Sequence, residues 1–487
     1  MDTITLEFKA VKAKIPIKGL TLEALEEMIF DIRQEIGKAA FADVLKQYDE
    51  VLRKSRPKGV LENICKKKKY LQTKAGDIQY IRTLYKDKAS GKSRYLLDDA
   101  LGISSNQRKS LKMSQLTTML ASETPYRAAQ EDLNKLLGVS LSHEAIRQTV
   151  IAEGKKIEEH EAQEYQKIRQ LDYQTPTEIP DAVYNEADAT YIRKQNKGLK
   201  TGNKQRHLEV KLGIGYTGKE PRYDSGKQKA KKLSKRLVYA EIKAGRNEFL
   251  DQYSCLAEKE FALSLAKKSY FGGDGDSWLR EGKEQYFSRS TYLLCPFHLF
   301  RNLRRALPGK KKSQSNLKKL IEKNKIAKAL KRLRRMIRMI HSRKIKKKLA
   351  EFYLYLHNNR QGIEASMSVR MDKKTESAGA IEPNIDKLIA HRFKGRGMSW
   401  SEQGAQSLLK IRQTISNNQW DDWWYKERGR KIEIRAIFKE PLTAKDMIKK
   451  RNIAPYIEAE MPCYRGPDQS KPWVGILHEL TRTKYLA

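Results

Sequence analysis

The order of strand-like segments between residues 182 and 296 constrains the fold of this chain more than any other feature of its sequence. The strand-like segments are Ala182–Ile192, His207–Tyr216, Arg236–Lys243, Ser269–Gly272 and Ser290–Leu294. The first three follow one another directly, which favours antiparallel pairing, whereas helical stretches flank the later ones, which favours parallel pairing. The pattern predicts an α/β domain at residues 180–415, built on a mixed five-stranded sheet with flanking helices.

The residues before this domain are predicted to be mainly helical, with one small sheet. Residues 1–60 contain an amphipathic helical stretch, Leu22–Val51, which ends at Pro57-Lys58-Gly59. Residues 61–123 contain two strand-like segments around Ala75-Gly76-Asp77, which is the pattern of a β-hairpin.

Residues 124–175 resemble a DNA-binding helix-turn-helix followed by a polar helical linker. The first helix stops at Gly138 and the second opens at Ser142. The second helix would present His143 and Arg147 outward, as such motifs do when they read DNA. An ordinary helical hairpin explains the same pattern about equally well.

The chain is strongly basic, and its charge is concentrated. There are 99 Lys and Arg against 59 Asp and Glu, a net charge of +40, and residues 301–350 alone hold 21 Lys and Arg against one acid, Glu322. Such clustering is typical of a surface that follows phosphates. We therefore expect a basic helical insertion at about residues 300–370 that binds nucleic acid. The arginines able to reach phosphates are Arg332, Arg334, Arg335 and Arg338.

Other classes of protein are disfavoured by composition. No run of about 18 apolar residues is present, which argues against a membrane span. The first residues have neither the basic nor the apolar region of a secretory signal. The four cysteines are scattered, so neither a disulfide framework nor a paired zinc site is expected. These features predict a cytoplasmic protein.

Three carboxylates stand at the ends of regular elements, where a ligand can reach them. Asp188 lies in the first strand-like segment, Asp274 follows the fourth between glycines, and Glu382 precedes Pro383 at a predicted helix start. A carboxylate in a half-buried strand is costly to desolvate unless a partner or metal accompanies it. Carboxylates converging in this way would suit two Mg²⁺ or Mn²⁺ ions.

Several other patterns are weaker. Residues 213–218 fit GxGxxG, but no helix opens after them to receive a pyrophosphate, so strand and turn are expected. Cys295 and His298 lack the second ligand pair of a zinc site, so a buried Cys and a His behind the metal ligands are expected. The aromatic residues of 420–425 fit core packing better than stacking on a base.

Taken in order along the chain, the motifs resemble those of the ISLre2-type insertion-sequence transposases, a UPF0236-like family related to the Mutator-like DDE transposases. The motifs are Glu-Ala-Asp188-Ala-Thr, Gly-Asp274-Gly with Trp278, Cys295-x-x-His298 after a strand, Ile381-Glu382, His391-Arg392 and Gly395-Arg396-Gly397-Met398-Ser399-Trp400. The likeness runs from about residue 65 to about residue 415.

The resemblance implies an RNase H-like core in which Asp188, Asp274 and Glu382 form a DDE triad that holds two Mg²⁺ or Mn²⁺ ions. It implies cleavage and strand transfer of the ends of the element, with DNA as the partner and a homo-oligomer assembled on it. His298, Arg392 and Arg396 would contact phosphate or position the strand, supported by Cys295. The location implied is bacterial and nucleoid-associated.

Two other functions fit the same residues. An RNase H-like nuclease would cut DNA without strand transfer, and a nucleic-acid-binding protein without catalysis would use only the basic surface. Residues 416–487 are treated as a separate C-terminal region, without an assigned role.

Overall fold

The computed structural model describes residues 21–57, 59–195, 206–224, 227–372, 378–395, 397–427 and 470 of the 487-residue chain. The chain divides into two compact units, residues 1–429 and 430–487, and the fold described below belongs to the first. Across the described residues, no helix combines the length and the apolar composition that a membrane span requires.

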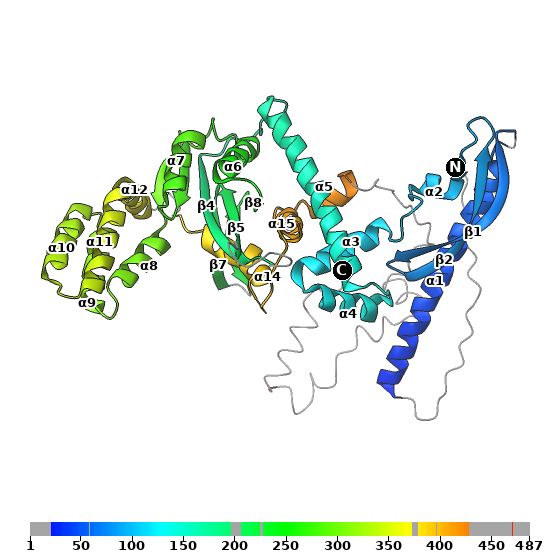
Figure 1. Cartoon of the computed structure of the whole chain (residues 1–487), viewed down its shortest axis with the longest axis horizontal. Helices are drawn as coiled ribbons and strands as arrows, with labels where there is room; N and C mark the ends of the chain where they lie inside the picture. Colours follow the sequence, from blue (N-terminus) through cyan, green and yellow to red (C-terminus); the bar gives the residue numbers. More distant parts are fainter. Residues whose placement is uncertain are drawn as a thin grey trace. The chain divides into compact units, whose positions relative to one another are not determined.

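A mixed five-stranded sheet forms the centre of this unit, as the strand pattern predicts (Figure 1). Its strands, in the order in which they lie side by side, are β10 (Thr291–Leu294), β9 (Lys268–Gly273), β4 (Ala182–Arg193), β5 (His207–Tyr216) and β8 (Leu237–Glu241). The pairs β4–β5 and β5–β8 are antiparallel, whereas β4–β9 and β9–β10 are parallel. The first strand in the chain is therefore the central one.

Helices cover both faces of the sheet, because alternate side chains of β4 point to opposite sides. Val183 and Ala187 belong to an apolar core with α6 (Arg246–Phe261) and α7 (Ser277–Tyr286). Tyr184 and Ile192 belong to the opposite core. The helices contributing to that second core include α5 (His143–Arg169), α13 (Ile381–Ile385) and α15 (Glu402–Ser416).

The segment after residue 150 is helical, as predicted, but it is a packed part of the preceding helix and not a linker. Helix α5 continues without a break to Arg169, and Gly154 on it lies against α15. A Cβ atom on Gly154 would come within 2.4 Å of Ser407 Cα, so only glycine permits this approach. The second helix of the predicted helix-turn-helix is thus the start of a 27-residue helix that packs into the core.

The stretch between β5 and β8, residues 218–234, is not a plain connection. It contains a two-stranded antiparallel ribbon, β6 (Gly218–Asp224) and β7 (Lys227–Ser234), which extends from the end of β5. This ribbon pairs within itself and is not part of the central sheet.

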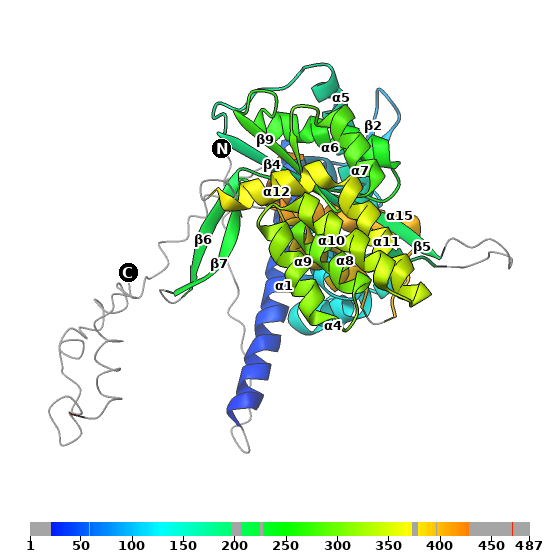
Figure 2. The ribbon, with the colours of Figure 1, turned by 90° about the vertical axis from the view of Figure 1, so that its left-hand side faces the viewer.

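The predicted basic insertion is a set of helices (Figure 2). Their buried apolar side chains form a core of their own. The helices are α8 (Pro296–Ala306), α9 (Lys311–Glu322), α10 (Ile326–Met339), α11 (Arg343–Asn358) and α12 (Arg360–Met371). Leu330 and Leu333 of α10 lie in this core, whereas the four arginines predicted to reach phosphates are exposed.

The N-terminal elements form a small sheet beside helices. They are α1 (Leu22–Ser55), β1 (Leu61–Thr73), β2 (Gly76–Asp87), β3 (Ser93–Tyr95), α2 (Leu96–Leu101), α3 (Leu111–Glu123) and α4 (Tyr126–Leu137). The predicted turn at residue 76 joins β1 to β2, and Leu45, Leu71 and Leu97 bury a shared apolar cluster.

The described chain after α13 is helical. It continues through η1 (Asp386–Ala390), α14 (His391–Phe393), α15, α16 (Trp420–Asp422) and η2 (Trp423–Glu427). The side chains of Trp420, Trp423 and Trp424 are buried, so these tryptophans pack in the core, as expected. The remainder of the predicted C-terminal region lies outside the described residues, apart from residue 470.

Candidate metal centre

Asp188, His298 and Glu382 meet at one point beside the central sheet. One potential ligand atom from each residue lies within 4.8 Å of those of the other two. His298 Nε2 is 2.9 Å from Glu382 Oε1 and 3.9 Å from Asp188 Oδ2. The three residues come from β4, α8 and α13, so elements far apart in the sequence build the group.

Local sequence explains how each of the three side chains is presented. Asp188 is four residues after Tyr184 on β4. Because side chains alternate along a strand, the two lie on the same face of the sheet. Pro296 begins α8 directly after β10, which places His298 in the first turn of that helix. Glu382 is the second residue of α13, as predicted from Pro383.

Asp274 lies immediately after β9 and outside the 4.8 Å group. The loop that carries it is firmly held, because the hydroxyl of Tyr355 on α11 donates to the Asp274 carbonyl oxygen at 2.6 Å. The next residue, Gly275, has φ +99°, and a Cβ there would come within 2.9 Å of Leu294 and Tyr355 side-chain atoms. The helical insertion thus helps to fix the second predicted carboxylate.

Glu186, two residues before Asp188, holds the start of α13 in place. Its buried carboxylate accepts hydrogen bonds from the backbone N–H groups of Gly379, Ala380 and Ile381 at 2.9, 3.0 and 3.3 Å. It also accepts one from the Tyr216 hydroxyl at 2.7 Å. An anionic acceptor satisfies the unpaired N–H groups of a helix start. Glu186 is therefore the residue that positions Glu382 beside Asp188.

Burial makes the three predicted acids hard to ionise. Burial, together with the charges of Asp274 and Glu382, raises the pKa of Asp188 to about 7. Burial likewise raises the pKa of Asp274 and that of Glu382. The Arg301 guanidinium on α8 acts in the opposite direction on the pKa of all three carboxyls, so it lies within electrostatic reach of each. Its Nε is buried without a hydrogen-bond partner among the described residues.

His298 is neutral at pH 7. Burial and the nearby charge of Arg301 lower its pKa to about 4. A neutral imidazole offers a lone pair on one ring nitrogen, which is the form in which histidine binds a cation. His298 therefore belongs to the group itself, whereas the sequence placed it behind the ligands.

The donor atoms fit a divalent cation. Glu382 Oε1 and His298 Nδ1 are buried without hydrogen-bond partners among the described residues, and the Glu382 oxygen is not aligned for a hydrogen bond with Nε2 despite the 2.9 Å separation. A buried carboxylate oxygen left unpaired is costly, and a cation bound between Glu382 Oε1 and His298 Nε2 would remove that cost at Glu382. Two carboxylates with one imidazole suit Mn²⁺ well and Mg²⁺ through the oxygens.

The remaining predicted site residues have mixed outcomes. Cys295 is buried at the N-cap of α8, and burial raises the pKa of its thiol to about 12, so it supports the fold near the site. The expected phosphate contact of Arg392 is wrong, because its buried guanidinium donates to the Ala121 carbonyl oxygen and lies over the Trp400 ring. Arg396 lies outside the described residues.

The two residues predicted to read DNA from the helix-turn-helix lie near the start of α5. His143 is exposed, as expected. Arg147 is half-buried, and its guanidinium is engaged by Glu144 through two hydrogen bonds of 2.7 and 2.8 Å. The charge of Arg147 is thus largely neutralised within its own helix.

Sequence reasoning missed Glu186, Arg301 and Tyr355. Arg301 had a usable signal, because it follows His298 by three positions and so shares its helix face. Glu186 also had one, since it stands on the same strand face as Asp188. Tyr355 is distant in sequence from every motif, so no local pattern indicates it.

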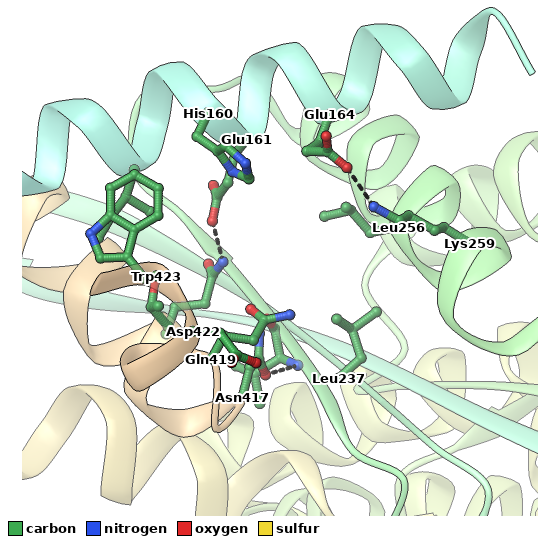
Figure 3. Close-up of a pocket in the computed structure, with 14 residues that line it drawn as sticks. His160, Glu161, Glu164, Leu237, Leu256, Lys259, Asn417, Gln419, Asp422 and Trp423 are labelled. Atoms are coloured by element: carbon green, nitrogen blue, oxygen red, sulfur yellow. Dashed lines mark hydrogen bonds and ion pairs between the residues drawn. The ribbon is translucent and has the colours of Figure 1, made fainter. Parts of the chain in front are cut away.

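A hollow of about 290 Å³ lies elsewhere, between α5, α6, β8 and the end of α15 (Figure 3). Glu164 of α5 pairs there with Lys259 of α6, and Glu161 accepts a hydrogen bond from Gln413. His160 meets Trp423 edge to face. These side chains hold neighbouring helices together, and the hollow shares no residue with the carboxylate group.

Comparison with known proteins gives a consistent family. The family model of UPF0236, an uncharacterised protein family, matches residues 16–428. A UPF0236 protein of Caldanaerobacter subterraneus subsp. tengcongensis is 24% identical over 425 residues, which cover 86% of this chain and 82% of the relative; its name joins eleven locus designations. A UPF0236 protein from the vanSb 3′ region of Streptococcus gallolyticus is 23% identical over 340 residues, 69% of each chain. These names state no activity.

Proposed function

The chain belongs to the UPF0236 family, and from this membership and the carboxylate group we propose that it is a DNA transposase with an RNase H-like core. The proposed reaction is metal-dependent cleavage of the ends of an insertion sequence and their transfer to target DNA. Asp188, Asp274 and Glu382 are the proposed DDE triad.

The observation that carries the proposal is the convergence of Asp188, Glu382 and His298 from three separate elements. Asp188 stands on the first and central strand, Asp274 follows the fourth strand in chain order, and Glu382 opens a helix beyond the fifth. This is the order of acids that an RNase H-like DDE core requires. Burying several carboxylates side by side costs desolvation and repulsion free energy, which acids exposed at the surface do not cost. Acids held at that cost are candidates for a functional site.

The residues have distinct proposed roles. When bound, a divalent cation would neutralise charge on phosphate oxygens and lower the pKa of a water. Asp188, Glu382 and His298 would hold one ion, and Asp274 with Asp188 would hold the second. Arg301, with its buried Nε unpaired, would donate to a phosphate oxygen and so orient the scissile bond.

The basic insertion supports DNA as the substrate. Arg332, Arg335 and Arg338 are exposed on α10, while the apolar face of that helix is buried. Exposed cations on a rigid helix give sequence-independent affinity for phosphates. A homo-oligomer on DNA belongs to the same proposal, because two element ends must be brought together. A nucleoid location belongs to it as well, because the substrate is DNA.

The relatives add support of a different kind. The Caldanaerobacter relative has eleven locus designations in its name. A protein encoded at many places in one genome is what repeated copying of a mobile element predicts.

The test uses supercoiled plasmid carrying the sequences that flank the gene on both sides. Wild-type protein and Asp188→Ala are compared with Mg²⁺, with Mn²⁺ and with EDTA. Nicking that requires both the metal and Asp188 is expected, with DNA binding retained by the variant. Asp181→Ala is the matched control, because Asp181 is an exposed acid paired with Lys267 at the surface.

The other two functions give different results in the same assay. A labelled DNA with a free 3′-hydroxyl is joined to target DNA by a transposase, whereas a nuclease cuts the plasmid and joins nothing. A protein that only binds nucleic acid retains binding and shows no metal-dependent cleavage with any variant, and that result would refute the catalytic proposal.

A further inference from the structure

A basic groove of about 660 Å³ lies beside α13, on the side of β6 and β7. The charged side chains that line it are Lys219, Lys231, Lys232, Lys235, Arg236 and Lys387. Among the described residues around it, every charged lining side chain is a cation; Asn384 and Asn418 are the polar neutral ones.

Cations gathered in a hollow repel one another and raise the local concentration of anions. Lys232, Lys235 and Lys387 are exposed, so their ammonium groups are accessible to a ligand. Arg236 is half-buried and donates to the Ser416 carbonyl oxygen and hydroxyl, which fixes the floor of the groove to the end of α15. The groove therefore has one anchored cation, Arg236, and exposed lysines around it.

The groove borders the segment that carries Glu382. Gly379, Ala380 and Pro383 line it, and Glu382 lies between them in the chain, with its carboxylate directed to His298. A ligand in the groove would thus pass the backbone of α13 on its way to the carboxylate group.

We propose that this groove holds the sugar–phosphate backbone of the DNA strand adjoining the scissile phosphate. The inference rests on the proposed function and goes beyond it, because none of the DNA contacts expected from the sequence lies on the ribbon or at Lys387. The ribbon supplies Lys219, Lys231 and Lys232 to the lining, and η1 supplies Lys387.

A chain of phosphates fits the groove better than a single phosphate. Backbone N–H groups at a helix start can bind a single anion. Here those of residues 379–381 already donate hydrogen bonds to the Glu186 carboxylate. What remains is a series of separate lysines, and separate point charges suit successive phosphates of a strand.

The first experiment measures binding without cleavage. A labelled duplex bearing the flanking sequence is titrated in EDTA, between 50 and 200 mM salt, against wild type and the triple variant Lys232→Glu, Lys235→Glu, Lys387→Glu. Each lost phosphate contact lowers the slope of log affinity against log salt by about 0.9, so we expect the slope to fall by about 2–3.

A matched variant separates local contact from total charge. Lys46→Glu, Lys155→Glu and Lys268→Glu change the same number of exposed lysines elsewhere in the chain. This control is expected to keep the slope of wild type. Equal losses in both triple variants would overturn the groove proposal, since net charge alone would then explain the effect.

The second experiment locates the contact on the DNA. Single phosphates near the scissile bond are replaced by neutral methylphosphonates, and each substrate is tested with wild type and with Lys387→Gln. If Lys387 holds a given phosphate, replacing that phosphate by methylphosphonate should weaken binding by wild type. The same replacement should leave binding by Lys387→Gln unchanged. Additive losses at every position would overturn the contact. Inorganic phosphate at millimolar concentration should not compete; full competition would indicate a single-phosphate site instead.

Failure of the two proposals is distinguishable. Cleavage that persists together with unchanged binding by the groove variant removes the groove and leaves the transposase. Binding through the groove without cleavage by wild type removes the transposase and leaves the groove. Wild type that does not bind DNA overturns both.

Discussion

Single residues decide where the carboxylates of this protein lie. Glu186 and Asp188 stand two positions apart on one face of β4 and have different tasks. Glu186 is satisfied by four hydrogen bonds from the α13 start and Tyr216. Asp188 faces other acids and a neutral imidazole, and the pKa of its carboxyl is raised. One carboxylate thus builds the site, and its neighbour is left available to a ligand.

Glu186→Gln tests the positioning role. A glutamine has one acceptor oxygen and would direct its NH₂ at backbone N–H donors, so we expect a loss of about 2–3 kcal/mol in the free energy of unfolding. Metal-dependent cleavage should fall further than the stability loss explains, because Glu382 loses its anchor. Urea denaturation and the plasmid assay measure the two effects. Glu209→Gln, which removes a partly exposed pair with Arg246, should cost less than about 1 kcal/mol.

Asp188→Asn tests the electrostatics of the metal-free protein. The folded-state pKa of about 7 exceeds the ordinary 3.8, so wild type takes up a proton on folding between these values and loses stability as pH rises from 4 to 7. Asp188→Asn does not lose stability in this way, because asparagine has no carboxyl group to ionise. In EDTA it should be more stable than wild type at pH 8, by up to about 4 kcal/mol, and the difference should vanish near pH 4.

Urea midpoints at both pH values measure this difference, with Asp181→Asn as the exposed control. Mg²⁺ or Mn²⁺ should stabilise wild type and leave Asp188→Asn unchanged, since only wild type retains the ligand. A variant less stable than wild type at pH 8 in EDTA would contradict the assigned pKa direction.

At the scale of elements, the contact of α5 and α15 with the edge strand β8 organises the core. Lys410 on α15 is buried and pairs with Glu161 of α5 at 2.7 Å and Glu241 of β8 at 3.2 Å. Burial works against its charged form, yet the two carboxylates hold the pKa of Lys410 above the ordinary value. Three elements are thus joined by one cation, which helps to hold the predicted linker segment of α5 against the core.

Lys410→Met should destabilise the protein by about 3–5 kcal/mol, because the buried Glu241 and the half-buried Glu161 lose their counter-charge. Thermal or urea unfolding measures the loss. Adding Glu161→Gln and Glu241→Gln should recover much of it, since the uncompensated charges are then removed. Lys243→Met, which breaks the more exposed pair with Glu158, should cost less than about 1 kcal/mol. Equal costs for both lysines would contradict the assigned role of Lys410.

At the scale of the molecule, the basic insertion has two roles. Through Tyr355 it fixes the loop of Asp274, and through α10 it presents exposed arginines. The first role is structural and follows from a hydrogen bond. The second belongs to the proposed function and is a matter of charge.

Replacing the four arginines of α10 by glutamine should weaken DNA binding equally for all sequences. The residues are Arg332, Arg334, Arg335 and Arg338. If each contacts one phosphate, the slope of log affinity against log salt should fall by about 3–4 in an anisotropy titration. The same four positions changed to lysine should keep the slope, because the charge is retained. An unchanged slope in the glutamine variant would show that these arginines of α10 do not contact the DNA phosphates.

Local sequence was sufficient to predict the mixed sheet, the strand order along the chain and the insertion, because alternation and helical periodicity are set by near neighbours. It also placed Asp188 within a strand, Asp274 after one and Glu382 at a helix start, and all three placements are confirmed. Only tertiary structure decided which side chains meet. His298 entered the group, and Arg392 was buried away from it, because α8 and α14 pack against particular partners.

The same reason explains the helix α5, the ribbon and Glu186. The apolar residues of α5 pack in the core, but only distant partners decide that Gly154 lies against Ser407 and that Glu158 pairs with Lys243. Glu186 has the sequence pattern of a metal ligand, yet its carboxylate caps the start of α13. Local sequence could not indicate this, because the backbone N–H groups that donate to it lie 193 to 195 positions further along the chain. The sequence by itself determined the elements and the chemistry available; contacts between residues far apart in the chain decided which carboxylate is paired and which is left to bind a ligand.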